Sequence, residues 1–329
     1  MAVKSEKRVA ATIEAPCSSR LLDDIKAELR PRLRELWNFI DLMRKDWTAM
    51  LGIVMVLSIV LMALFAPLLA PRQNARDPLQ FPRDLALPKP PFQEGVPILG
   101  TGANGIDIYY GVVWGARTTI VTSLYVVLTA ALIGLVLGSI AGFYGGKIDE
   151  IIMRFTDVFL SIPALILAMA IAAVLTRSLE HMMLALIMVW WPSYARLMRG
   201  QVLSVRENTY VEAARAIGCK RSRILFKHIT PNSISPLIVC VTLDLGAVAL
   251  ISASLSYIGF GVGPGYAEWG RMISDGQRWF LSTITYNGVA YNPWWVVAFP
   301  GLALLIFTMG CSLIGDGLRD ILDPRSRRG

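Results

Sequence analysis

The feature that most constrains this chain is an uncharged apolar run from Thr48 to Ala70. About 20 apolar residues, each adding 1.5 Å of helix rise, are enough to cross the hydrocarbon core of a bilayer. Backbone groups in that core must be satisfied within the spanning element, so the run predicts a membrane helix. The whole chain of 329 residues is 54% hydrophobic and only 17% charged, which excludes an ordinary soluble domain.

Five further apolar segments lie downstream. They predict spans near residues 118–142, 157–176, 181–198, 233–258 and 294–315. The segment near 181–198 has the shortest apolar stretch, because His181 and Arg196 bound it. The polar ends of these two side chains would have to reach the membrane interface. We therefore expect an all-α, polytopic membrane protein with six transmembrane helices.

The distribution of basic residues predicts the orientation. Of the 32 Lys and Arg residues, 24 fall in segments 1–47, 143–156, 196–232 and 316–329. Cytoplasmic segments carry the excess of Lys and Arg, so both termini are expected in the cytoplasm. The net charge of +8 is therefore explained by the membrane topology. The basic residues do not gather into one stripe, so the charge does not indicate nucleic-acid binding.

The N-terminal segment precedes the first span. From Arg20 to Trp47, apolar residues recur at helical spacing among charges, which predicts an amphipathic helix at the inner membrane surface, in contact with lipid. A cleavable signal peptide fits badly, because the first apolar run begins after 47 polar residues. The four cysteines fall in cytoplasmic segments or spans, so no disulfide is expected, and the two histidines are far apart and indicate no metal site.

The segment between the fourth and fifth spans says most about function. Tyr210–Gly218 predicts a short helix with one small, flat side, ended by Gly218, and Arg221 begins a second helical stretch. Ile229-Thr230-Pro231-Asn232 follows. Small residues let the backbone of a neighbouring protein approach closely. The pattern predicts a docking helix over 208–218.

This pattern resembles the signature cytoplasmic loop of ABC-importer permeases, with Thr230 where that family usually has Leu. Further motifs in the same order resemble the C-type permease subunit of the dipeptide, oligopeptide and nickel transport family. They include the run from Glu268 to Gly276 and the stretch from Gly315 to Arg325. The resemblance implies that the docking helix contacts an ATPase through Glu212, Ala213, Ala214, Arg215, Gly218 and Arg221. It also implies that Trp269, Gly270 and Arg271 face a solute-binding protein.

The apolar runs, the distribution of basic residues and the resemblance together predict the domain organisation. A cytoplasmic tail with the amphipathic helix occupies 1–47, the first transmembrane helix 48–70 and an extracytoplasmic loop 71–117. A core permease domain follows at 118–315, with a coupling loop at 199–232 and an extracytoplasmic loop at 259–293; the cytoplasmic tail is 316–329.

The implied function is a non-enzymatic permease subunit of an ATP-driven importer for peptides or similar solutes, in the inner membrane of a prokaryote. Its partners would be a second, B-type permease, two ATP-binding subunits and an extracytoplasmic solute-binding protein. ATP and magnesium would bind those ATPases and no cofactor would bind this chain. Two glycine-rich stretches mimic nucleotide sites but fail: no βαβ unit follows Gly100, Gly102 and Gly105, and Ile148 stands where a phosphate loop needs Ser or Thr.

Asp244 is the one clear charge inside a predicted span, where a carboxylate costs roughly 2.5 to 3.5 kcal/mol. It could contact a cationic group in the translocation path, or serve as a structural partner for a polar neighbour. An ion-coupled secondary transporter or channel using Asp244 is the alternative function. An intramembrane protease using Asp157 and Asp244 fits less well, because Asp157 is expected at the cytoplasmic edge of a span. Four acidic residues at expected cytoplasmic span ends, Asp149, Glu150, Asp157 and Asp316, are expected to cap helices or to pair with Arg154 and Arg319.

Overall fold

The computed structural model describes residues 41–71, 77, 79, 81, 87–263 and 265–322. The chain divides into two compact units, Met1–Trp47 and Thr48–Gly329, and the elements named below belong to the second, apart from Trp47, the first residue of α3. Most of the predicted interfacial helix over Arg20–Trp47 lies outside the described residues, as does the tail beyond Leu322.

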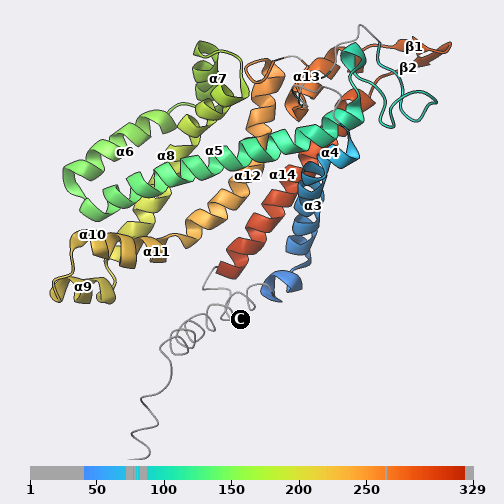
Figure 1. The fold of residues 1–329 in the computed structure, drawn as a ribbon. Helices are drawn as coiled ribbons and strands as arrows, with labels where there is room; N and C mark the ends of the chain where they lie inside the picture. The colour runs from blue at the N-terminus through green and yellow to red at the C-terminus, as the bar shows by residue number, and fades with distance from the viewer. Residues whose placement is uncertain are drawn as a thin grey trace, which may run out of the picture. The chain divides into compact units, whose positions relative to one another are not determined.

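The described chain is mostly helical, as predicted (Figure 1). The helices are α3 (Trp47–Leu64), α4 (Ala66–Leu69), α5 (Ile108–Tyr144), α6 (Gly146–Leu160), α7 (Ala164–Val174), α8 (Leu179–Arg206), α9 (Thr209–Ala216), α10 (Arg221–Arg223), α11 (Thr230–Ser233), α12 (Ser235–Ile258), α13 (Trp269–Phe280) and α14 (Trp295–Leu322). A 3-10 turn, η1, covers Ala103–Gly105 and a π-helical turn, η2, covers Ile224–Ile229. One small hairpin, β1 (Ile284–Tyr286) paired antiparallel with β2 (Val289–Tyr291), departs from the all-α prediction.

Four of these helices are long and apolar enough to cross a membrane: α3, α5, α12 and α14. A fifth span results if the bent pair α6 and α7 is counted as one. Charged and polar residues along α8 keep it out of this group, although it has 28 residues and would be long enough. The helices extend beyond the predicted spans, since α5 begins at Ile108 and α14 continues to Leu322.

The span predicted near 157–176 is broken in the structure and begins earlier. The structure has α6 beginning at Gly146, a break after Leu160, and α7 continuing at an angle of 88°. The break occurs at Pro163, which has no backbone N–H and disfavours helical geometry at the residue before it. Asp157 consequently lies three turns into α6 and not at the start of a helix.

The longest helix, α5, packs along α8 through a row of small residues. Gly134, Gly138 and Gly142 recur every four residues, which places them on one face of α5. A Cβ on Gly142 would lie only 2.8 Å from the Arg199 carbonyl oxygen, and one on Gly138 2.8 Å from the Cβ of Met198. Such glycines let two helix backbones approach closely. Close packing of this kind holds helices together in a bilayer, where the hydrophobic effect does not drive their association. A similar approach joins α3 to α14, where Gly52 faces the Gly310 carbonyl oxygen.

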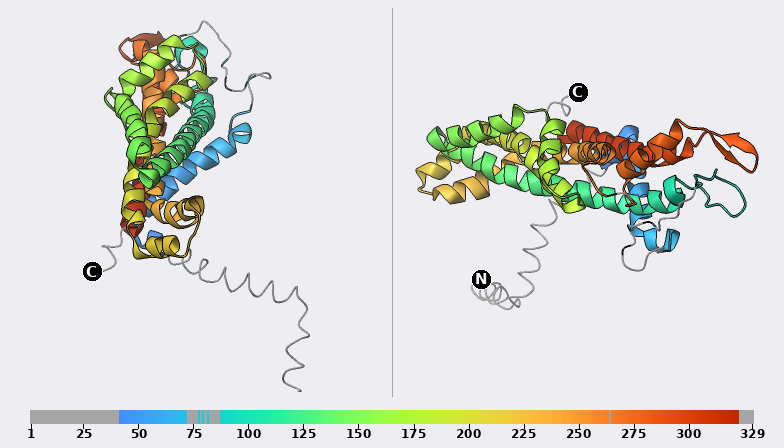
Figure 2. Two further views of the ribbon diagram at one scale, coloured as in Figure 1. Left: turned by 90° about the vertical axis from the view of Figure 1, so that its left-hand side faces the viewer. Right: turned by 90° about the horizontal axis from the view of Figure 1, so that it is seen from above.

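Figures 1 and 2 show that the short helices α9 and α10 lie at one end of α5 and that α13 and the hairpin lie at the other. At the hairpin end, three buried tryptophans each donate an indole hydrogen bond to a backbone carbonyl. Trp114 donates to Ala70, Trp269 to Val112 and Trp295 to Thr101, at 3.0 to 3.1 Å. These bonds connect the end of α4, the first turns of α5, α13 and α14.

Candidate functional site

The docking helix that the sequence predicts is α9, from Thr209 to Ala216. It ends at Gly218, whose φ of 79° lies in the left-handed region that glycine adopts without strain. The Cys219 amide donates to the Ala214 carbonyl at 3.1 Å and the Gly218 amide to the Arg215 carbonyl at 3.0 Å. These bonds satisfy carbonyls at the end of α9 and reverse the chain toward α10.

One face of α9 is buried and the other is exposed. Val211 and Ala214 pack inward in the same cluster as Ile224 and Leu225 of η2. Glu212, Ala213 and Arg215 are exposed, as are Ala216 and Gly218. Ala214, one of the predicted docking residues, therefore positions the helix, while the exposed residues of α9 include the small Ala213 and Ala216, the charged Glu212 and Arg215 and the larger Tyr210.

The segment from α9 to α11, residues 209–233, is called the coupling segment below, and it leads into a membrane helix, α12. After Gly218, α10 begins at Arg221 as predicted, but the chain then winds as a π-helical turn, η2, before α11 and α12. Arg206 at the end of α8 donates to the Gly142 carbonyl of α5 at 3.1 Å. The segment is thus held at both ends by helices that pack together.

A cavity of about 480 Å³ separates the coupling segment from the end of α5. Its lining includes Arg215, Cys219 and Arg221 from the coupling segment and Phe143 and Tyr144 from α5. Two predicted docking residues, Arg215 and Arg221, therefore line one space and give it positive charge.

Two ion pairs fasten α6 to α8. Asp149 accepts two hydrogen bonds from Arg199, at 2.9 and 2.7 Å, and Asp157 pairs with Arg196. The prediction that these aspartates would cap helices or pair with Arg154 or Arg319 is therefore wrong. The reason is the broken span, since α6 lies along α8 and brings both aspartates opposite its arginines.

Asp244 lies ten residues into α12 and is half-buried. It lines a cavity of about 370 Å³ together with Trp190 and Ser193 of α8 and Pro163 at the α6–α7 break. Asp157, engaged with Arg196 and outside the residues lining this cavity, does not form a proton-sharing pair with Asp244.

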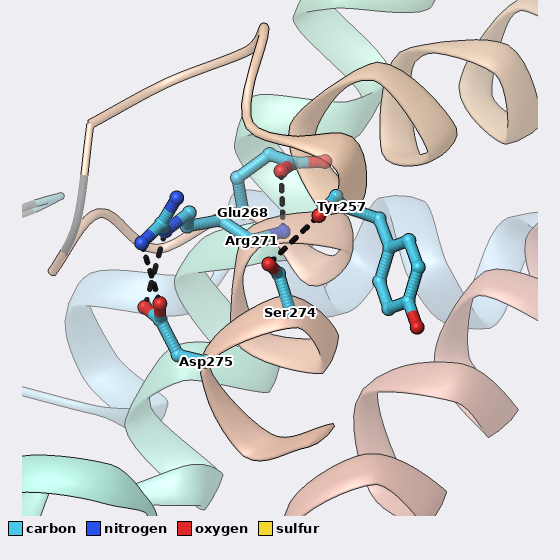
Figure 3. A network of polar contacts seen from close by, with 5 residues as sticks. All are labelled: Tyr257, Glu268, Arg271, Ser274 and Asp275. Carbon is cyan, nitrogen blue, oxygen red and sulfur yellow. Dashed lines mark hydrogen bonds and ion pairs between the residues drawn. The ribbon is translucent and has the colours of Figure 1, made fainter. Parts of the chain in front are cut away.

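The third predicted site lies at the start of α13. Glu268 caps the helix by accepting from the Gly270 and Arg271 amides at 3.1 and 2.8 Å. Figure 3 shows the contact with the Arg271 amide and the ion pair between Arg271 and Asp275. The Ser274 hydroxyl donates to the Tyr257 carbonyl, which ties α13 to the end of α12. Burial raises the pKa of the Glu268 carboxyl, while hydrogen bonds to it act in the opposite direction.

The predicted binding-protein-facing residues occupy different environments. The Trp269 side chain is fully buried, and Gly270 packs on the backbone of Ala253, so both position α13. Arg271 lines a polar cavity of about 660 Å³ with Ser274, Gln277 and Arg278. Sequence reasoning missed this polar face of α13, although its residues recur at helical spacing in the loop.

The chain matches two known protein families. The family described as binding-protein-dependent transport system inner membrane component matches residues 134–328. The N-terminal TM domain of oligopeptide transport permease C matches residues 36–91. Both matches agree with the predicted resemblance and favour a permease subunit over an ion-coupled transporter or channel.

Individual relatives cover most of the chain. It is 41% identical over 273 residues to a probable D,D-dipeptide transport system permease protein of Escherichia coli (strain K12), covering 83% of this chain and 86% of that protein. It is 36% identical over 285 residues to an oligopeptide transport system permease protein of Bacillus subtilis (strain 168), covering 87% and 88%.

Among solved structures, the MetNI methionine ABC transporter in an inward-facing conformation has a similar fold. The TM-score is 0.50 at 19% identity, and the match covers 65% of this chain and 97% of that one. At this identity the likeness concerns the fold alone. The family matches and the coverage of the relatives show that this chain belongs to the family of inner membrane components of binding-protein-dependent transport systems, as a non-catalytic permease subunit.

Proposed function

We propose that this chain is the C-type permease half of an ATP-driven importer and that α9 is its docking helix for an ATPase. The observation that carries the proposal is the exposed small face of α9. Ala213 and Ala216 lie exposed beside Glu212 and Arg215, and the opposite face is packed on η2. A helix surface of this kind fits into a groove on another protein with little steric hindrance.

The proposed mechanism is mechanical. ATP-driven closure of two ATPases moves α9, and the movement passes through α10, η2 and α11 into α12, with only Ile234 between α11 and α12. Small displacements are amplified because packed helices have a few discrete arrangements and do not deform continuously. ATP and magnesium belong to the ATPases in this proposal, and no cofactor belongs to this chain.

We further propose six spans with both termini in the cytoplasm of a prokaryote, in its inner membrane. In this arrangement α3, α5, α8, α12 and α14 each cross once, and α6 with α7 forms one broken span. The packing of α8 along α5 supports its inclusion, because glycine contacts run from Gly134 to Gly142 on an apolar helix. The Lys and Arg excess in the predicted inner segments supports the orientation.

Six spans supply half of a path, so the assembly requires a B-type permease, two ATP-binding subunits, an extracytoplasmic solute-binding protein and surrounding lipid. The polar face of α13 around Arg271 is the proposed contact for the binding protein. Peptides are the proposed solute, because relatives that match most of the chain are named for dipeptide and oligopeptide transport.

Copurification tests the docking proposal. The tagged chain is isolated from its native membrane as wild type, Glu212→Arg and, as a matched exposed control away from the coupling segment, Glu94→Arg. Wild type and Glu94→Arg should retain ATPase activity and the second permease, whereas Glu212→Arg should retain only the permease. Wild-type chain that purifies without any ATPase would refute the proposal.

A further inference from the structure

The cavity beside Asp244 combines one carboxylate with aromatic and apolar walls. Asp244 comes from α12, Trp190 and Ser193 come from α8, and Phe159 and Pro163 come from the break between α6 and α7. Three segments distant in sequence therefore converge on one charged group. We call this space the Asp244 cavity.

The carboxylate lies well inside the span. Asp244 is nine residues from the first residue of α12, and at 1.5 Å per residue this places it about 13 Å along the helix. The buried Tyr194 hydroxyl and the Trp190 indole both lie close enough to the Asp244 carboxylate to interact with it, although the Tyr194 contact does not have regular hydrogen-bond geometry. No basic residue lines the cavity among those that the structure describes.

The face of α8 next to the cavity does not suit lipid. Arg196 lies one turn beyond Ser193 and pairs with Asp157, and their side chains are 54% and 56% exposed. A charged pair this exposed within a bundle of spans would be costly against hydrocarbon, so it faces water or another protein. The water-filled path of the proposed importer provides such surroundings.

The chemistry of the lining selects an organic cation. A carboxylate attracts positive charge, an aromatic wall such as Trp190 adds cation–π attraction, and the Ser193 hydroxyl can accept a hydrogen bond from an ammonium group. The cavity does not suit a divalent metal ion, because no group of three His, Cys, Asp or Glu side chains that could hold one occurs among the described residues. Apolar walls from Phe159 and Leu160 favour a cation that carries hydrocarbon.

We propose that the Asp244 cavity binds the primary ammonium group of the transported solute on its way through the path. The proposal rests on the proposed importer function and adds the chemical class of the group that the membrane domain recognises. Recognition would then occur twice, first by the binding protein and again at Asp244.

Charge-selective thiol labelling tests this cavity in the assembled complex. Ser193→Cys is introduced after replacing Cys17, Cys219, Cys240 and Cys311 with Ser, and native membranes are treated with a cationic or an anionic methanethiosulfonate. Rates are normalised to those of Glu94→Cys, which is exposed in the loop before η1. We expect the normalised cationic rate to exceed the anionic rate by about tenfold, corresponding to one nearby charge contributing roughly 1.4 kcal/mol.

Two variants locate the source of that preference. Asp244→Asn should bring the normalised ratio of cationic to anionic labelling rates close to one. Asp244→Glu should keep the cationic preference, and that result would show that a carboxylate substitution leaves the site folded. Alanyl-alanine amide should slow labelling, and N-acetyl-alanyl-alanine amide, which lacks the ammonium group, should not. Equal rates for both reagents in the wild-type background, or protection by both peptides, would overturn the proposal.

The same preparation separates this inference from the importer function. If ATPases copurify but the thiol introduced by Ser193→Cys reacts with neither reagent, the cavity is covered by lipid or by the partner permease and the inference fails alone. If ATPases do not copurify, the importer proposal fails, and the labelling ratio still reports whether Asp244 attracts cations.

Discussion

Gly218 is the residue on which the shape of the docking segment depends most. Its φ of 79° is left-handed, and no atom lies within 4 Å of the position that a Cβ would occupy, so a substitution there acts through the backbone alone. A non-glycine residue in this conformation costs roughly 1 to 2 kcal/mol, and Asn tolerates it better than Val. We expect Gly218→Val to reduce ATPase copurification roughly 5- to 30-fold, and Gly218→Asn to retain most of it. Full ATPase retention by Gly218→Val would show that the turn does not matter.

Glu268 predicts a pH dependence. Burial raises the pKa of its carboxyl above the unfolded value of about 4.3, so its contribution to stability is full below that pH and is lost as pH rises through the folded-state pKa. The unfolding temperature of the wild-type complex should therefore fall as pH rises from about 4.5. Glu268→Gln, which keeps an acceptor for the Arg271 amide, should flatten the curve, and Glu94→Gln should not. Parallel curves for wild type and Glu268→Gln would contradict this assignment.

The glycine row between α5 and α8 makes a prediction at the scale of elements. A Cβ on Gly138 would overlap the Ala195 carbonyl and the Met198 side chain, whereas one on Gly200 of α8 meets open space. Gly to Ala in a helix otherwise gains about 1 kcal/mol. Gly138→Ala should therefore lower the unfolding temperature of the purified complex and Gly200→Ala should raise it. Shifts of the same sign would argue against close α5–α8 contact.

The Asp149–Arg199 pair offers a second test between elements. Asp149 is 17% exposed and Arg199 37% exposed, and removal of one partner leaves a half-buried charge unpaired. Asp149→Arg and Arg199→Asp should each lower the yield of assembled complex, and the double variant should recover part of it. The yield of assembled complex is measured by size-exclusion chromatography. A double variant whose loss of yield equals the sum of the two single losses would contradict the pairing.

Elements were predictable from sequence only where periodicity and length decide them. The spans now in α3, α5, α12 and α14 follow from apolar runs, and Gly218 follows from helix-ending chemistry. The path of α6 was not predictable, because the 88° break depends on how Pro163 acts together with Arg196 and Arg199 of α8. The hairpin had a readable signal that was missed, the Asn287-Gly288 turn, in which both residues have positive φ.

At the scale of the whole molecule, the coupling segment and the Asp244 cavity belong to connected helices. α9 leads through η2 and α11 into α12, and α12 carries Asp244. Family membership was predictable because several motifs occur in a fixed order along the chain. The sequence did not predict the partner of Asp157 or the lining of the Asp244 cavity, because contacts between residues far apart in sequence decide both.

The most direct measurement of the central claim is site-specific photocrosslinking from α9 in native membranes. A benzophenone amino acid at Ala213, on the exposed small face, is compared with one at Glu94 in the loop before η1. We predict that Ala213 captures an ATP-binding subunit, identified by mass spectrometry, and that Glu94 does not. An adduct absent at Ala213, in a complex that still contains the ATPase, would contradict the claim that α9 is the docking helix.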